Sequence, residues 1–282
     1  MRTNIAIKHG FTLILICMVN LLFAQVPEEI KWKFLVKSYS ADSSQMVLTL
    51  NNKPLDGQYK VPFDEGGFAL YSIKRGMITG EAFWYSQGGR MECKLYYKNG
   101  VRNGSKENYD NNGAVWLKQQ YKDGKLDGAD EMYSSGKLMS KGQYKNGLKN
   151  GMQYSYMNGT LTSETNYVNG LKNGLAKGYG TDGKLVMEVN FKDNKRNGLY
   201  RTYADGAIMM ETNYIDGVEN GLSTMYALGK KNMDFEYLNG KRNGIGHLYK
   251  LDGTILFTQY FINGLKVTKE VFEKYQQNLK NK

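Results

Sequence analysis

Very few residues of this chain have side chains suited to catalysis or metal binding. The 282-residue sequence contains two Cys and two His, and one of each lies within the first 24 residues. Cys93 and His247 are therefore the one pair that could form a Cys–His dyad, in which a histidine activates a thiol as nucleophile. A zinc site needs about four closely spaced ligands, so this pair is too small a set.

No other catalytic or cofactor motif occurs in the structural context that its chemistry requires. No Ser lies in a Gly-x-Ser-x-Gly elbow, and no P-loop or GxGxxG motif follows a buried strand. The segment Asp110-Asn-Asn-Gly113 is faintly similar to a calcium loop, but it lacks the alternating acids and the closing Glu. We therefore predict no catalytic residue, no cofactor and no metal, in a protein that is not an enzyme.

The composition predicts many tight turns between short strands. The chain has 33 Gly and 22 Tyr but only 3 Pro and 3 Trp, which excludes collagen and favours turns. Hydrophobic residues make up 41% and charged residues 23%, as is typical of a chain that folds. The formal net charge of +11 suits an anionic partner.

Residues 1–24 are predicted to be a secretory signal peptide. Arg2 and Lys8 form a basic start, an apolar run follows, and Ala24 precedes a polar stretch. The apolar run is shorter than the roughly 20 residues that span a bilayer. Cys17 lies inside that run, so we reject lipidation. We expect an exported protein, in the periplasm, at the cell surface or outside the cell, where nucleic acid is not a predicted partner.

A repeat of 23 or 24 residues fills most of the remaining chain. Its anchor is a glycine that follows Asn in most units. A tyrosine lies five residues after each anchor from Gly80 onward, and a second aromatic residue lies seven residues before each anchor from Gly104 onward. The repeat length varies only in the turn after the tyrosine, which predicts an exposed hairpin tip there. The anchors are Gly57, Gly80, Gly104, Gly128, Gly151, Gly174, Gly198, Gly221 and Gly244.

Each unit is predicted to be a β-hairpin, and the fold to be all-β. We expect an elongated single-layer antiparallel sheet of stacked hairpins with a short C-terminal capping helix. In the unit that begins at Gly128, 129–133 is predicted as a strand, 134–136 as the turn and 137–144 as the returning strand. Residues 145–151 are predicted to link this unit to the next. Two strands per unit, about 4.8 Å apart, make ten units about 95 Å long.

Both ends of the repeat array are predicted to carry caps. We interpret 25–56 as an N-terminal cap that includes a degenerate first repeat, and 57–267 as the regular repeats. Residues 268–282 are predicted to form a helix, because Thr268 is a good N-cap and apolar residues follow it at helical spacing. Such a helix, lying over the last strand, would cover an open sheet edge.

The unit resembles the MORN repeat and, more closely, its bacterial variant. The resemblance rests on segments such as Tyr121-Lys-Asp-Gly-Lys-Leu-Asp-Gly128 and Tyr144-Lys-Asn-Gly-Leu-Lys-Asn-Gly151, and it covers about 57–267. It implies an elongated sheet of hairpins with a role in protein scaffolding or in attachment to phospholipid surfaces. Bacterial variants are often labelled as antitoxins of toxin–antitoxin systems. The predicted export signal argues against that role, because an antitoxin meets its toxin in the cytoplasm.

The repeat spacing also excludes a Cys–His dyad within one chain. Cys93 and His247 lie seven units apart, on the order of 65 Å at the spacing of stacked strands. No hydrogen bond between them is possible within one chain. We interpret Cys93 as a small packing residue and His247 as a solvated strand residue.

Two columns of side chains are candidate binding sites. Basic residues two positions before an anchor form a candidate ladder for a partner or an anion; the alternative is a solvated row that blocks edge-to-edge aggregation. The repeat tyrosines are a candidate aromatic surface; the alternative is a structural stack. The ladder comprises Arg102, Lys149, Lys172, Arg196, Arg242 and Lys266. The tyrosines are Tyr85, Tyr109, Tyr133, Tyr156, Tyr179, Tyr203, Tyr226 and Tyr249.

A third column changes sign along the chain and predicts a basic N-terminal half and an acidic C-terminal half. Its members are Lys94, Lys118, Lys141, Glu164, Glu188, Glu211 and Asp234. Together these features predict a non-catalytic scaffold for protein–protein interaction in the cell envelope, with an unknown envelope protein as partner. The alternative is a peripheral binder of anionic lipid or polysaccharide that uses the ladder. Binding by the ladder should weaken steeply with salt, whereas a buried aromatic interface should not.

Overall fold

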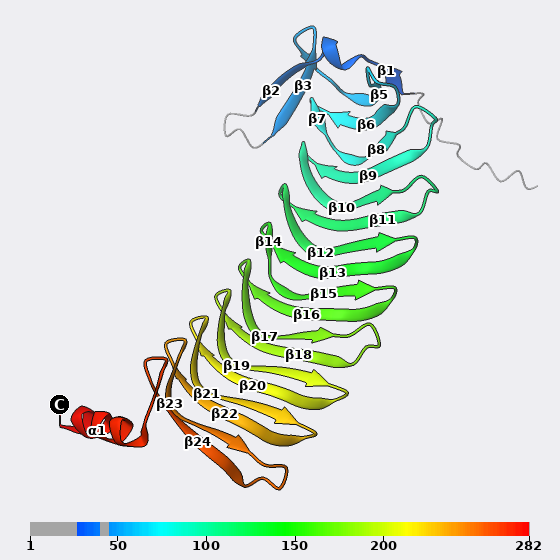
Figure 1. Ribbon diagram of the computed structural model, residues 1–282. Coiled ribbons are helices and arrows are strands. Elements are labelled where there is room, and N and C mark those ends of the chain that lie inside the picture. Colours follow the sequence, from blue (N-terminus) through cyan, green and yellow to red (C-terminus); the bar gives the residue numbers. More distant parts are fainter. Residues whose placement is uncertain (1–26, 40–44, 282) are drawn as a thin grey trace, which may run out of the picture.

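The predicted all-β architecture is confirmed. The computed structural model describes residues 27–39 and 45–281, so the predicted signal peptide lies outside the described residues. Over these ranges the chain forms one open 22-stranded sheet, a separate three-stranded sheet and a C-terminal helix. Figure 1 shows a long curved ribbon of stacked strands, with the small sheet at one end and the helix at the other.

The long sheet is built by short hairpins in chain order. From β5 to β25 the strands of the ladder are antiparallel and adjacent in sequence or separated by one short strand, whereas β1 is parallel to β5. The strands are β1 (Glu28–Glu29), β5 (Gly57–Pro62), β6 (Phe68–Lys74), β7 (Met77–Ile78), β8 (Gly80–Tyr85), β9 (Met91–Lys98), β10 (Val101–Tyr109), β11 (Val115–Lys122), β12 (Lys125–Ser134), β13 (Lys137–Lys145), β14 (Leu148–Lys149), β15 (Gly151–Met157), β16 (Thr160–Val168), β17 (Leu171–Tyr179), β18 (Leu185–Lys192), β19 (Lys195–Ala204), β20 (Ala207–Ile215), β21 (Val218–Ala227), β22 (Lys230–Leu238), β23 (Lys241–Tyr249), β24 (Ile255–Ile262) and β25 (Leu265–Val267).

Each repeat has two hairpin turns, where the sequence predicted one turn and a linker. The expected linker over 145–151 folds as a second hairpin, because Asn146 and Gly147 both adopt left-handed backbone angles (φ 52° and 85°). Two such residues form the tight turn whose twist matches that of paired strands. The extra residue of the longer repeats lies in the other turn. In the repeat that begins at Gly104, this turn is closed by the Asp110 N–H, which donates to the Ala114 carbonyl over 2.8 Å.

The linking turns stack on one another along one side of the ribbon (Figure 1). The Gly124 N–H donates to the Arg102 carbonyl of the preceding repeat over 2.8 Å, and the Asn103 side-chain amide donates to Asp123 over 3.1 Å. Equivalent side-chain bonds join Asn173 to Asp193, Asn197 to Asp216 and Asn220 to Asn239. The Asn of an Asn-Gly anchor therefore ties its repeat to the next one. Sequence reasoning had assigned these residues only to turns.

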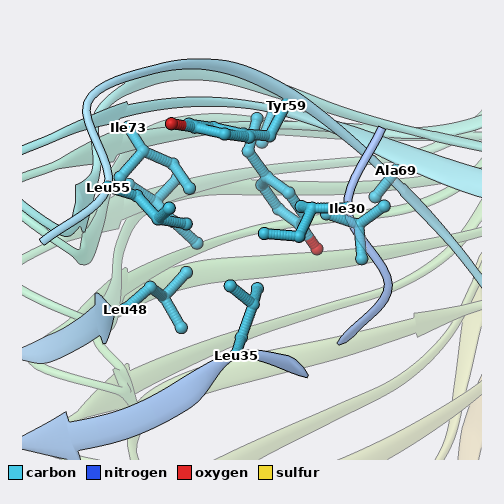
Figure 2. Close-up of a cluster of buried hydrophobic side chains, with 11 residues drawn as sticks. Ile30, Leu35, Leu48, Leu55, Tyr59, Ala69 and Ile73 are labelled. Atoms are coloured by element: carbon cyan, nitrogen blue, oxygen red, sulfur yellow. The ribbon is translucent and has the colours of Figure 1, made fainter. Parts of the chain in front are cut away.

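The N-terminal end carries the main hydrophobic core. The segment that sequence reasoning interpreted as a degenerate repeat forms β2 (Val36–Tyr39), β3 (Met46–Leu50) and β4 (Lys53–Pro54), a small sheet outside the long one. Leu48 is fully buried, and its N–H donates to the Gly76 carbonyl over 2.8 Å. Figure 2 shows Leu48 and Leu35 from this end facing Leu55 and Ile73 across the core. The small sheet thus closes one end of the ribbon.

The C-terminal helix is confirmed, but it covers the last strand only in part. Helix α1 (Lys269–Lys280) begins after Thr268, whose side chain accepts the Val271 N–H over 3.4 Å. Phe272 is buried, with its ring 5.3 Å from the Tyr260 ring of β24. The start of β24 stays open, since the side chains at 255–257 are about half exposed. Within the described residues, no helix is long and apolar enough to cross a membrane.

Candidate functional site

The long sheet has two faces with different chemistry. Paired residues on neighbouring strands point to the same side, so the register assigns each repeat position to a face. We call one the charged face, because it carries the acids and bases paired through Glu107, Lys118 and Glu131. The opposite side is the aromatic face, which carries Tyr97, Tyr121 and the other aromatic residues found seven positions before each anchor.

A column of alternating charge runs along the charged face. Salt bridges within it join Lys177 to Glu164 (3.6 Å) and Arg201 to both Glu211 (2.6 Å) and Glu188 (4.0 Å). We call it the charge column. In strand order its members are Lys94, Glu107, Lys118, Glu131, Lys141, Tyr154, Glu164, Lys177, Glu188, Arg201, Glu211, Thr224, Asp234 and His247.

The charge column corrects the predicted division into a basic half and an acidic half. The lysines at 94, 118 and 141 have acids directly opposite them on the outgoing strands, and the acids from Glu164 onward have bases opposite them. Opposite charges at this spacing neutralise one another. The prediction is wrong because its residues all lie on the returning strand of each hairpin, while the compensating charges lie on the outgoing strands.

Six of the eight repeat tyrosines donate their hydroxyl protons to acids of the charge column. The Tyr203 hydroxyl lies 2.6 Å from Glu188, and burial together with this bond raises its pKa. Tyr85, by contrast, stacks on Phe68 at 4.8 Å between ring centres, near the N-terminal end. These contacts favour the interpretation of the tyrosines as a structural stack. The other hydroxyl bonds join Tyr109 to Glu107, Tyr133 to Glu131, Tyr179 to Glu164, Tyr226 to Glu211 and Tyr249 to Asp234.

We predict that the fold weakens in strong alkali because these phenols must stay protonated. Burial and the neighbouring carboxylates raise the pKa of Tyr109, Tyr179 and Tyr249 to about 12, above the ordinary value of 10.0. A group whose pKa is raised by folding stabilises the fold below its unfolded pKa, and this contribution is lost as pH rises from about 10 to about 12. Tyrosinate absorbance should therefore show a late-titrating class, from which Tyr179→Phe removes one member. A single transition near pH 10 would contradict the assignment.

The candidate basic ladder lies against the aromatic face. Lys172 lies 5.1 Å from the centre of the Phe191 ring, and Arg242 lies 3.8 Å from that of Phe235 and 5.5 Å from that of Phe261. Lys266 pairs with Phe261 at the end of the array and is exposed. The other members lie over the ring of the next repeat: Arg102 over Tyr121, Lys149 over Tyr167 and Arg196 over Tyr214.

Cation–π contacts of this kind contribute about 0.5–1 kcal/mol each at accessible sites. The ladder therefore helps to fasten successive repeats, and an anion that bound it would compete with the rings. A ladder cation paired with a ring is a poorer anion site than a free lysine.

A second basic row, which sequence reasoning missed, follows the linking turns. From Asn99-Gly100 to Asn263-Gly264, the residues immediately before and after each turn dipeptide are all Lys or aliphatic, and none is acidic. We call them the turn ridge. Nearly all are exposed, and its lysines form no salt bridge within the described ranges. The pairs are Lys98 and Val101, Lys122 and Lys125, Lys145 and Leu148, Val168 and Leu171, Lys192 and Lys195, Ile215 and Val218, Leu238 and Lys241, and Ile262 and Leu265.

The signal for the turn ridge was present in the sequence at fixed offsets of six and three residues before each anchor. The prediction of 145–151 and its equivalents as linkers does not place these two offsets beside each other. Only the hairpin geometry shows that the two offsets are neighbours across a turn.

Cys93 and His247 lie on β9 and β23, far apart along the ribbon (Figure 1). Cys93 is half-buried, and burial raises the pKa of its thiol against the opposing effect of Lys106 and Arg102. His247 is not the solvated residue that was predicted. Its Nδ1 lies 2.9 Å from the buried carboxylate of Asp234. His247 is therefore the last member of the charge column.

We expect the sign pattern of the charge column to contribute to stability. Glu188→Lys would place three positive charges in a row with Lys177 and Arg201 and remove the acceptor of Tyr203. Glu188→Gln keeps an acceptor of similar size and serves as the matched control. The Lys variant should be about 1 kcal/mol less stable than the Gln variant in urea titrations, and added salt should narrow the gap. Equal stabilities at low salt would contradict the role of the column.

Comparison with known families is consistent with this geometry. The residues 132–146 and 172–193 match a family model described as the MORN repeat variant. These two segments are similar to MORN repeats. MORN repeats in general are a non-enzymatic repeat type that binds proteins or membranes. The match gives no support to an antitoxin function, and no curated protein matched the chain.

Proposed function

We propose that this chain is a MORN-repeat protein that acts as an exported, non-catalytic scaffold and binds an envelope protein through the C-terminal half of its charged face. The supporting observation is a row of aliphatic side chains beside the charge column, one in each successive repeat. We call it the aliphatic column. It consists of Met152, Leu175, Leu199, Leu222 and Ile245, each directly after an anchor glycine.

The aliphatic column has the chemistry of a protein interface. Leu175 and Leu222 are 40% and 42% exposed, and the alternation of each strand places them on the same face as Lys177 and Thr224. The repeat tyrosines lie further along the same strands. Rows of aliphatic and tyrosine side chains around hydrogen-bonding groups are typical of protein–protein contacts. Ser105 and Ala129 occupy the same position in earlier repeats, so the surface is confined to the C-terminal half.

The size of the native complex tests this proposal. In size-exclusion chromatography of a gently solubilised envelope extract, the chain should elute in a complex that survives high salt. The Leu175→Ser/Leu222→Ser variant should elute at the size of the free chain, while Ser105→Leu should elute like the parent. A parent chain that elutes free, or a double variant that stays in the complex, would overturn the proposal.

The turn ridge favours a second candidate function, attachment to an anionic lipid surface. Its aliphatic side chains could enter the headgroup region while the free lysines contact phosphates. This differs from the predicted use of the ladder, whose cations already lie on aromatic rings. The exposed pair Lys192 and Lys195 and the exposed Leu148 are the members on which this candidate depends.

Vesicle co-sedimentation tests the second candidate. The chain should bind vesicles that contain phosphatidylglycerol and should not bind neutral vesicles. Binding should weaken as the salt concentration rises. A triple variant, Lys145→Gln/Lys192→Gln/Lys195→Gln, should bind less than a control triple variant of equal charge at Lys137, Lys250 and Lys274. Equal binding by the two triple variants would reject the ridge.

Export itself is tested by the N-terminus of the protein recovered from cells. The predicted cleavage after Ala24 would leave Gln25 as the first residue. A recovered chain that still begins at Met1 and stays in the cytoplasmic fraction would contradict export and remove an envelope partner from consideration.

A further inference from the structure

Strand β24 has an outer side that its counterparts in earlier repeats do not leave open. Strand β22 pairs with the following strand twice, at Tyr237–Leu238 beside the turn and again at Met233–Phe235. Strand β24 pairs with β25 only at Tyr260–Ile262, because the chain turns into α1 after Thr268. A strand with peptide groups open on one side is a template for another strand.

The open stretch is apolar and uncharged. Ile255, Leu256 and Phe257 are 50%, 51% and 46% exposed, whereas Met233, which matches Phe257 in β22, is half-buried. Residues 254–259 contain no charged side chain and no proline, and β-branched and aromatic residues favour strand pairing. Helix α1 does not cover this stretch, since its buried Phe272 contacts Tyr260 further along the strand.

The sequence of the open stretch fits a second copy of itself. Thr254-Ile-Leu-Phe-Thr258 is nearly palindromic about Leu256. In an antiparallel pair centred on Leu256, each Ile255 faces a Phe257 and each Thr254 faces a Thr258. Apolar residues then meet apolar residues, and no like charges are opposed. A two-fold pairing of identical patches closes after two copies.

A head-to-tail arrangement fits less well. The other edge of the long sheet ends in β1, which consists of two glutamates, and Lys60 of β5 forms a salt bridge of 3.1 Å with Glu29. The small sheet β2–β4 packs at the same end. In the described part of this end, the edge strand β1 therefore offers no uncharged sequence like that of residues 254–258.

We propose that the protein forms a two-fold dimer in which β24 of one copy pairs antiparallel with β24 of a second copy, centred on Leu256. The dimer joins two ribbons end to end into one continuous sheet. It rests on the open strand alone and is independent of the proposed envelope partner.

Sedimentation equilibrium on the chain without its signal segment tests the dimer. The parent should show a reversible monomer–dimer equilibrium. Leu256→Lys should weaken dimerisation at least about tenfold, because edge lysines oppose strand pairing. Leu251→Lys is the matched control, since Leu251 is 67% exposed in the adjacent turn. This variant should dimerise like the parent. Monomeric parent protein at every concentration, or equal weakening by both variants, would overturn the proposal.

Disulfide trapping in a Cys93→Ser background tests the register. Leu256→Cys should cross-link with itself on mild oxidation. Ile255→Cys and Phe257→Cys should each remain uncross-linked alone but form a mixed dimer when combined. A strongest self-cross-link at any position other than 256 would overturn the proposed centre, and circular dichroism of each variant shows that its fold is retained.

Discussion

Replacing Leu48 by Ala is expected to lower the free energy of unfolding by about 3 kcal/mol, the usual cost of removing a fully buried leucine. Leu48 has no exposed surface and lies among Ile30, Leu35, Leu55 and Tyr59. It joins the small sheet to the long one, since its N–H bonds to Gly76 and its carbonyl accepts the Leu55 N–H. The cavity would therefore open at the junction of the two sheets.

Urea denaturation followed by tryptophan fluorescence measures this effect, because Trp32 and Trp84 pack against the same cluster. Val36→Ala is the matched control in the neighbouring strand, since Val36 is 55% exposed and should change stability little. Similar losses for the two variants would mean that the small sheet is not a packed cap.

Asp234→Ala is expected to have the second large effect, about 2–3 kcal/mol, because it removes a buried acceptor and leaves two half-buried donors without it. Asp234 is 5% exposed, and its carboxylate accepts the Tyr249 hydroxyl over 2.7 Å and lies 2.9 Å from His247 Nδ1. Burial raises the pKa of Asp234, but the bonds from Tyr249 and His247 outweigh it and lower the net pKa. The carboxylate is thus held in its charged form.

The sign of the pH dependence follows from that lowered pKa. A carboxyl group whose pKa falls on folding stabilises the fold above its unfolded pKa, here 3.8, and loses this contribution as pH falls through the folded pKa. The difference in unfolding free energy between the parent and Asp234→Ala should therefore be full at neutral pH and shrink in strong acid. Asp205→Asn, at an exposed turn, should match the parent. A difference that did not change with pH would contradict the assignment to the carboxylate.

The repeat architecture could be predicted because its signals are local. Asn-Gly pairs favour turns with left-handed backbone angles, and alternating apolar residues such as Met187 and Val189 indicate strands. The repeat length and the spacing of these residues were therefore enough to predict the hairpins. Thr268 likewise predicted the start of the helix. These features depend on a few neighbouring residues and not on distant contacts.

The relations between strands could not be predicted in the same way. Asp127 and Asn146 meet only because the linker folds as a hairpin, and their 3.0 Å bond gave no signal in spacing. The neutral pairing of Lys118 with Glu131 requires the register of two strands. The departure of β2–β4 from the long sheet accompanies the burial of Leu48 between the two sheets, a contact that the repeat frame does not reveal.

Photo-cross-linking in the native cell tests the central claim, that the C-terminal half of the charged face holds a protein partner. Probes at Leu175 and Leu222 report the aliphatic column, and probes at Ser105 and Ala129 report the same position in repeats without it. A probe at Leu148 reports the turn ridge. We predict one protein adduct, unchanged by salt, from Leu175 and Leu222 and none from the other three. Equal adducts from all five positions, or a protein adduct from Leu148 alone, would contradict the account.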